Sequence, residues 1–208
     1  MNKYLTELIG TFFLVLTIGC TVIGAAPNVI APLAIGAVLM VMVYAGGHVS
    51  GAHYNPAVTL AVWMRGRCAT KDVVPYWIMQ IVGAVLAAIV VKYLVGRSSV
   101  TVMLPDRPRA LVAEFLYTFA LAYVVLNTAT AKGTSGNSFY GLAIGFTVMV
   151  GVFAAAGISG GAFNPAVAVG ISVMGLSMWP NIWIFLVGDL LGAAAAATVF
   201  KMVNPDDK

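Results

Sequence analysis

The chain has 208 residues, of which 61% are hydrophobic and only 9% are charged, with 11 basic and 7 acidic side chains and a formal net charge of +4. Soluble globular domains carry about 25% charged residues, so this composition excludes an ordinary soluble fold. The few basic residues are scattered through short connections between apolar runs, which excludes a basic surface for nucleic acid. We therefore expect an integral membrane protein without a nucleic-acid partner.

Two long tracts contain no Lys, Arg, Asp or Glu, from Leu8 to Met64 and from Gly133 to Gly188. As helices rising about 1.5 Å per residue, both could cross a bilayer of about 30 Å more than once. Apolar runs punctuated by Gly, Pro and charge predict an all-α membrane protein with six transmembrane helices, at residues 4–24, 33–47, 73–95, 110–131, 138–157 and 179–202. The second and fifth spans are short, and each leads into a Gly-rich segment that cannot cross again.

The distribution of basic residues predicts how the chain is oriented. An even number of spans places both termini on one side of the membrane. Lys and Arg are more frequent in the connections on that side, which predicts cytoplasmic termini in the plasma (inner) membrane. The basic residues on the side of the termini are Lys3, Arg65, Arg67, Lys71, Lys132, Lys201 and Lys208, against Lys92, Arg97, Arg107 and Arg109 on the other side.

Three segments recur in the same order at nearly equal offsets. Residues 7–12 (Glu-Leu-Ile-Gly-Thr-Phe) resemble residues 114–119, residues 49–58 resemble 158–167, and residues 80–84 resemble 189–193. This spacing indicates a duplication within a single channel domain, residues 1–208, whose halves cover about 1–100 and 108–204. Because each half holds three spans, the second enters the membrane from the opposite side. The sequence thus predicts an inverted repeat with its functional centre near the midplane.

Each half contains an Asn-Pro-Ala tripeptide after its Gly-rich stretch, Asn55-Pro56-Ala57 and Asn164-Pro165-Ala166. Proline in the first turn with Asn as the cap is typical of a helix start. Only about ten apolar residues follow, so each motif predicts a re-entrant half-helix. Opposed at the midplane, the two would direct free N–H groups and about half a positive charge each at one point, where a cation is repelled.

The residues before each Asn leave backbone carbonyls without helical partners, which a membrane tolerates only along a wet cavity. These are Gly51, Ala52, His53 and Tyr54 in the first half and Gly160, Gly161, Ala162 and Phe163 in the second. With the side-chain amides of the two asparagines as central donors, they predict a track for small uncharged polar molecules moving in file. The donors would also interrupt a continuous hydrogen-bonded chain.

The doubled motif, together with the paired Glu-x-x-x-Thr-Phe segments, resembles the aquaporin (major intrinsic protein) family over essentially the whole chain. The resemblance implies six tilted helices plus two re-entrant half-helices, one pore per subunit and a homotetramer. It also implies that Glu7 and Glu114 brace the re-entrant loops, with a proton relay as the alternative. It places His53 at the pore and His48 against a loop; for both the alternative is a satisfied buried imidazole, which we expect for His48.

The chain departs from the family at the outer constriction, where an arginine usually follows the second motif and Val167 stands here. Aligned on the family, the other constriction positions are Ile35, Val152 and Gly161. This apolar filter lacks the donors and one barrier to positive charge. We expect ammonia, hydrogen peroxide and small polyols or amides to pass as well as water, with an ordinary water pore as the alternative. Glycerol facilitators typically carry Asp where Ala168 stands.

Asp189 is a second departure, because similar proteins more often have proline there. An intramembrane carboxylate is a candidate functional group, although its repeat partner Gln80 indicates a polar contact between helices. The alternative function is a secondary transporter coupled through Asp189. No Ser-His-Asp order, metal-spaced cluster or phosphate loop occurs in the sequence. We therefore expect no enzyme, no metal and no cofactor.

Overall fold

The computed structural model describes residues 1–24, 29–96 and 100–207; Arg97 and Lys208, which enter the charge comparison above, lie outside the described residues. In this part of the chain six helical segments are long and apolar enough to cross a membrane, as predicted. They are α1 (Asn2–Val22), α2 (Ile30–Ser50), α4 (Thr70–Val95), α5 (Arg107–Val125) with the π-helical turn η1 (Leu126–Thr130), α6 (Tyr140–Ser159), and α8 (Ile182–Val203) with the 3-10 turn η3 (Trp179–Asn181).

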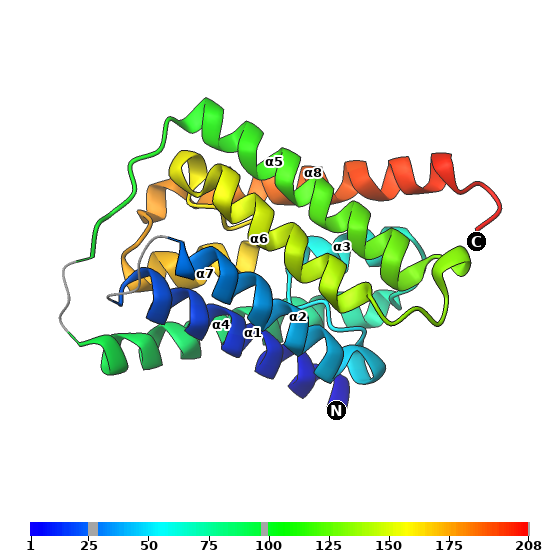
Figure 1. The fold of residues 1–208 in the computed structure, drawn as a ribbon, viewed down its shortest axis with the longest axis horizontal. Helices are drawn as coiled ribbons and strands as arrows, with labels where there is room; N and C mark the ends of the chain where they lie inside the picture. The colour runs from blue at the N-terminus through cyan, green and yellow to red at the C-terminus, as the bar shows by residue number, and fades with distance from the viewer. Residues whose placement is uncertain (25–28, 97–99, 208) are drawn as a thin grey trace.

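Two shorter helices, α3 (Pro56–Met64) and α7 (Pro165–Met174), follow the Asn-Pro-Ala motifs. In Figure 1 the long helices run roughly along the horizontal; α3 lies toward the end that holds both chain termini and α7 toward the opposite end. Each half-helix packs against the last long helix of the other half, α3 against α8 and α7 against α4. The half-helices therefore tie the two halves of the chain together.

The prediction of a short second span was wrong, because α2 extends over Ile30–Ser50. Pro32 lies in the first turn of the helix, where a missing N–H costs no intrahelical hydrogen bond. Gly46 and Gly47 do not end the helix either. Gly46 is where the Tyr54 hydroxyl packs against α2, and a Cβ added there would overlap it. These glycines therefore serve close packing and do not mark a helix end.

The first and last long helices of each half pack closely through glycine. On α4, a Cβ added to Gly83 would lie 2.5 Å from the carbonyl oxygen of Leu8 on α1. On α8, a Cβ at Gly192 would overlap the carbonyl oxygen of Phe115 on α5. Small residues allow this close helix approach within a membrane. The α1–α4 contact thus has a counterpart in the α5–α8 contact, at positions that match in the two repeats.

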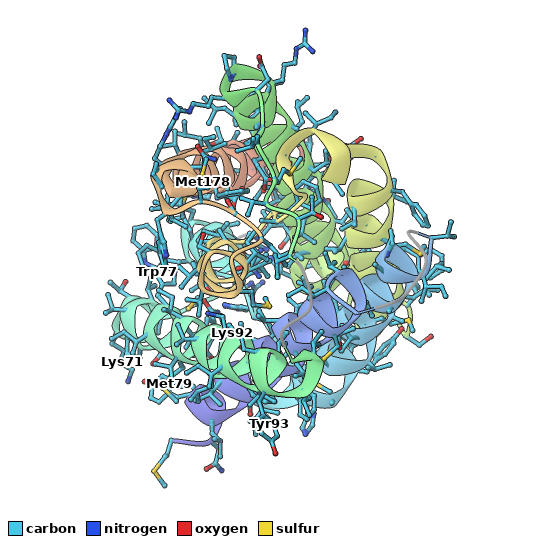
Figure 2. The ribbon with its side chains drawn as sticks, turned by 90° about the vertical axis from the view of Figure 1, so that its left-hand side faces the viewer. Lys71, Trp77, Met79, Lys92, Tyr93 and Met178 are labelled. Carbon is cyan, nitrogen blue, oxygen red and sulfur yellow. The ribbon has the colours of Figure 1, made fainter. Side chains whose placement is uncertain are left out.

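The outer faces of the long helices are apolar. Large hydrophobic side chains are exposed along α4, α6 and α8, among them Ile78, Ile89, Phe146, Phe153 and Leu191. Figure 2, a view from the end opposite the termini, shows Tyr93 near the end of α4 directed away from the bundle. A belt of this kind is expected of a surface that faces lipid, so the chain is an integral membrane protein.

Candidate functional site

The two Asn-Pro-Ala loops meet and are joined by reciprocal hydrogen bonds. Asn55 Nδ2 donates to the Phe163 carbonyl at 2.8 Å, and Asn164 Nδ2 donates to the Tyr54 carbonyl at 2.9 Å. An amide NH2 group carries two hydrogens. Each asparagine therefore keeps one hydrogen for a molecule in the cavity that both side chains line.

Each asparagine also caps its half-helix. Asn55 Oδ1 accepts from Ala57 N at 2.8 Å, and Asn164 Oδ1 accepts from Ala166 N at 2.9 Å. Both asparagines are extended, with φ of −155° and −163°, and proline occupies the first helical position after each. The side-chain Oδ1 atoms are thus used in capping the half-helices, while the side-chain NH2 groups remain available to the cavity. The prolines and alanines of the two motifs form the first turns of α3 and α7.

The residues before the asparagines include several with unusual backbone conformations. Ala52, Tyr54 and Phe163 adopt left-handed conformations, with φ of 51°, 52° and 48°. Such residues each cost on the order of 1–2 kcal/mol. Their N–H groups are bonded to side chains of the surrounding helices, that of Ala52 to Ser50 Oγ, that of Tyr54 to Glu7 and that of Phe163 to Glu114. Gly161, with φ of 64°, adopts the same kind of conformation.

Glu7, a fully buried side chain of α1, binds the first loop. Its Oε1 accepts from the Ser50 hydroxyl at 2.7 Å and from His53 N at 3.0 Å. Its Oε2 accepts from Tyr54 N at 2.6 Å and from Gln80 Nε2 at 2.8 Å. One carboxylate therefore satisfies two loop N–H groups and holds the left-handed Tyr54 in place.

Glu114 of α5 binds the second loop in the same way and is equally buried. Its Oε1 accepts from the Ser159 hydroxyl at 2.6 Å and from Ala162 N at 3.1 Å, and its Oε2 accepts from Phe163 N at 2.7 Å. Neither Glu7 nor Glu114 is among the described residues that line the two cavities. This placement favours bracing of the loops over a proton relay.

The first cavity is mostly apolar, has a volume of about 630 Å³ and opens away from the termini. All four expected constriction residues, Ile35, Val152, Gly161 and Val167, line it. So do the loop residues before the two asparagines, except Gly51, which lines a second cavity. Among the described residues that line the first cavity, none carries a formal charge. The positive ends of α3 and α7 are therefore the main fixed electrostatic feature at its centre.

The second cavity, of about 910 Å³, lies on the side of the termini. It shares four lining residues with the first one: Ala52, His53, Val125 and Ile144. Its other walls come from the end of α2, from the segment between α3 and the start of α4, and from the connection between α5 and α6. The two cavities thus adjoin beside the first Asn-Pro-Ala loop, and together they extend along the bundle.

His53 lies where the two cavities adjoin. Its Nδ1 is 3.1 Å from Thr59 Oγ1, and its ring stacks edge-on against Tyr76 with centroids 5.1 Å apart. The Thr59 hydroxyl donates its hydrogen to the Asn55 carbonyl at 3.0 Å. Nδ1 must therefore carry the hydrogen of the neutral ring, which leaves Nε2 as an acceptor.

His48 was expected to be a buried imidazole, and this expectation was wrong. The side chain is exposed and lines the second cavity. The reason is the length of α2, which continues to Ser50 and places His48 in its last helical turn. The helix thus carries the imidazole outward instead of folding it into the loop.

The sequence did not identify the connection between α4 and α5 as part of the site. Thr101, Met103 and Pro105 line the first cavity. Met103 N donates to the Leu176 carbonyl at 3.0 Å, which fixes the connection to the segment after α7. The sequence feature that could have indicated this position is the apolar run Val102-Met103-Leu104, which lies in a connection that otherwise has the composition of a linker.

Asp189 of α8 is fully buried, and its Oδ1 accepts from the Thr118 hydroxyl at 3.1 Å. It does not appear among the described residues that line either cavity. A coupling carboxylate of a transporter would be expected at the substrate path.

Comparison with known proteins gives a consistent picture. Residues 1–200 match the family described as Major intrinsic protein. The chain is 36% identical over 217 residues to Glycerol uptake facilitator protein-like 6 of Lactiplantibacillus plantarum, with 100% of both chains covered. It is 35% identical over 226 residues to Aquaporin NIP1-2 of Arabidopsis thaliana, covering 100% of this chain and 76% of that protein. Its fold is similar to the X-ray structure of the aquaglyceroporin from Plasmodium falciparum, with a TM-score of 0.81 at 18% identity over 98% of this chain and 97% of that one.

Proposed function

The chain belongs to the major intrinsic protein family, and we propose that its two adjoining cavities form one passive path for water and small uncharged solutes, with Asn55 and Asn164 lining the first of them. The observation that carries this proposal is the reciprocal pair of hydrogen bonds from each asparagine to the opposite loop. These bonds hold two amide donors at the point where the half-helices meet. A solute accepts from the donors there and exchanges its other hydrogen bonds with the loop carbonyls.

The solute range extends beyond water to ammonia, hydrogen peroxide and small polyols or amides. Ile35, Val152, Gly161 and Val167 act as the outer filter, and none of them has a side-chain hydrogen-bond donor. Without a fixed guanidinium, the filter is wider and loses a barrier to larger neutral molecules. The names of relatives support both parts of the range, since one is an aquaporin and another a glycerol uptake facilitator protein.

A coupled transporter is not favoured. Asp189, the carboxylate on which such coupling would depend, lies away from both cavities and accepts from Thr118 on the neighbouring helix. Catalysis is not expected either, because the family consists of channels.

The whole chain, residues 1–208, acts as a single channel domain built from inverted repeats at about 1–100 and 108–204. Both termini are cytoplasmic in the plasma (inner) membrane, and four copies assemble as a homotetramer. In support of the orientation, Lys3 pairs with Asp72 at 2.6 Å and Arg65 with Asp207 at 2.5 Å. These contacts gather basic side chains at the end of the bundle that holds the termini.

Stopped-flow light scattering on proteoliposomes tests the proposal, comparing water, glycerol, urea and ammonia, with a pH-sensitive dye inside the vesicles to detect proton leak. We expect fast water flux, measurable flux of at least one larger neutral solute, and no dependence on an imposed proton gradient. Water flux equal to that of protein-free vesicles, or flux driven by the gradient, would contradict the proposal.

A further inference from the structure

The two halves of the chain brace their loops with different chemistry at one matching pair of positions. In the first half, Gln80 Nε2 donates to Glu7 Oε2 at 2.8 Å and to Thr59 Oγ1 at 3.0 Å. The matching residue of the second half is Asp189. An ionised carboxylate has no hydrogen to donate, so Asp189 can replace the amide of Gln80 only if it carries a proton.

The surroundings of Asp189 lack a donor for one of its oxygens. Oδ1 accepts from the Thr118 hydroxyl at 3.1 Å, whereas Oδ2 is buried without a hydrogen-bond partner in the described part of the chain. Glu114 is the repeat partner of Glu7, to which Gln80 donates, and it lies across the helix contact from Asp189, because a Cβ added to the adjacent Gly188 would lie 3.0 Å from Glu114 Cβ. Two buried carboxylates in contact repel each other unless a proton or a cation lies between them.

The packing leaves no room for a cation. A Cβ added to Gly188 would lie 3.0 Å from Glu114 Cβ, and one added to Gly192 would overlap the Phe115 carbonyl. Helices α5 and α8 therefore touch on both sides of the carboxyl pair. Neither Glu114 nor Asp189 is among the described residues that line the two cavities, from which an ion could enter. A proton is the species that fits.

No positive charge from the packed elements neutralises the pair. The half-helices α3 and α7 and the turns η1 and η3 contain no Asp, Glu, His, Lys or Arg. Helix α5 contributes Glu114 itself and Tyr117, whose ring packs on Phe163. Arg107 and Arg109, at the start of α5, and Lys201, near the end of α8, are exposed.

We propose that Asp189 and Glu114 hold one proton between them, with the Asp189 carboxylic acid donating from Oδ2 to Glu114 as the Gln80 amide donates to Glu7. Asp189 is then a positioning residue. It positions Glu114, whose oxygens accept from the N–H groups of Ala162 and Phe163, and the Phe163 carbonyl in turn accepts from the amide of Asn55. The brace of the second loop depends on a proton, and the brace of the first does not.

Infrared spectroscopy of the purified protein tests the proton directly. At neutral pH, where carboxyl groups open to water are ionised, we expect one carbonyl band of a protonated carboxylic acid. The band should shift when aspartate is labelled with ¹³C at the side-chain carboxyl and should vanish in Asp189→Asn. Absence of the band, or a shift with labelled glutamate only, would overturn the proposal. Because labelling uses the unmodified chain, this test does not depend on how any variant folds.

Variants test the positioning role. In Asp189→Asn the amide NH2 group takes the place of Oδ2 and donates without an added proton. The variant should therefore keep the water permeability of the wild type within about twofold and its melting temperature within a few degrees. Asp189→Leu, of similar volume, removes the donor and should lower both clearly. Equal behaviour of the two variants, or damage in Asp189→Asn as large as in Asp189→Leu, would overturn the proposal.

A pH series separates a proton-dependent brace from ordinary packing. Wild-type stability should fall at alkaline pH, where the pair loses its proton and the two charges repel, and the fall should be absent in Asp189→Asn. A parallel fall in both proteins would contradict the shared proton. The permeability readout rests on the proposed channel function, but the infrared and stability readouts do not. A protein without flux that shows the aspartate band would therefore refute the channel and leave the shared proton standing.

Discussion

Asn55 donates to the Phe163 carbonyl at 2.8 Å, and the N–H of the same Phe163 is held by Glu114 at 2.7 Å. The donor of the first half is thus positioned by the glutamate of the second half. The reverse also holds, because Asn164 donates to the Tyr54 carbonyl and Tyr54 N donates to Glu7. Each glutamate therefore positions the asparagine of the other repeat. A substitution that displaces one loop should also displace the asparagine of the other loop.

Asn164→Ala tests the meeting point of the loops. The change removes the helix cap, worth about 1 kcal/mol, and with it the donor that reaches the Tyr54 carbonyl. We expect water permeability per channel to fall several-fold, measured by stopped-flow light scattering and normalised to the amount of reconstituted protein. Asn2→Ala, at an exposed position of α1, is the matched control. Wild-type permeability in Asn164→Ala would show that the reciprocal bonds are dispensable.

Glu7→Gln tests the brace of the first loop. The carboxylate accepts four hydrogen bonds, and an amide would turn an NH2 group toward at least one of the donors. An unsatisfied buried donor costs about 1–3 kcal/mol, so the melting temperature in detergent should drop by several degrees. Asp206→Asn, an exposed change in the C-terminal tail, should leave it unaltered. A Glu7→Gln protein as stable as the wild type would mean that the left-handed loop is held by other contacts.

Val167→Arg tests the outer filter. Val167 is 3% exposed and lines the first cavity with Gly161. A guanidinium there would narrow the path and add a fixed positive charge. We expect the flux of glycerol and urea to fall much more than that of water. Val167→Met, which adds length without charge, should have a smaller effect on selectivity. An unchanged ratio of solute to water flux in Val167→Arg would show that position 167 does not select.

Much of the fold could be predicted because the lipid environment restricts the choices. A chain in hydrocarbon must satisfy its backbone within helices, so apolar runs such as the one before Lys92 predict spans directly. The Asn-Pro-Ala motifs predicted the half-helices because Pro56 and Pro165 can begin a helix but cannot lie further inside one. These signals are local and therefore visible in the sequence.

The parts that were missed depend on contacts between distant segments. The left-handed conformation of Tyr54 and Phe163 follows from the glutamates that bind their N–H groups. No local propensity predicts it, since bulky residues disfavour that region. Met103 lines the first cavity because its backbone N–H donates to the Leu176 carbonyl. That pairing depends on tertiary structure and leaves only a short apolar run as its signal.

Gly192→Ala tests the close contact of α5 and α8. The added methyl group would overlap the Phe115 carbonyl, so the helices must separate or the backbone must shift. Overpacking of this kind costs about 1–3 kcal/mol, and the melting temperature should fall by several degrees. Gly133→Ala is the control, because nothing lies within 4 Å of its added Cβ. If both variants melt at the temperature of the wild type, α5 and α8 can accommodate a methyl group at position 192 and their contact is less close than the structure shows.

Asp207→Asn tests how the C-terminal tail is attached to the end of the bundle that holds the termini. Asp207 Oδ1 accepts from Arg65 Nη2 at 2.5 Å and its Oδ2 accepts from Lys132 N at 2.8 Å. Arg65 is buried, with its guanidinium 4.8 Å from the centre of the Phe200 ring. Removing the carboxylate would leave this cation without its partner, so the variant should be less stable than the wild type at pH 7.

The same pair predicts a definite pH dependence. The Lys132 N–H, followed by the charges of Arg65 and Lys132, holds the pKa of Asp207 below its ordinary value of 3.8. A lowered pKa in the folded state means that the stabilisation is complete above pH 3.8 and is lost as the pH falls through the folded-state value. The difference in melting temperature between wild type and Asp207→Asn should therefore be constant near neutral pH and shrink below pH 3.8. Asp206→Asn, the control, should melt like the wild type. If the difference in melting temperature between wild type and Asp207→Asn persists at the lowest pH, packing of the tail, and not the charge of Asp207, holds Arg65.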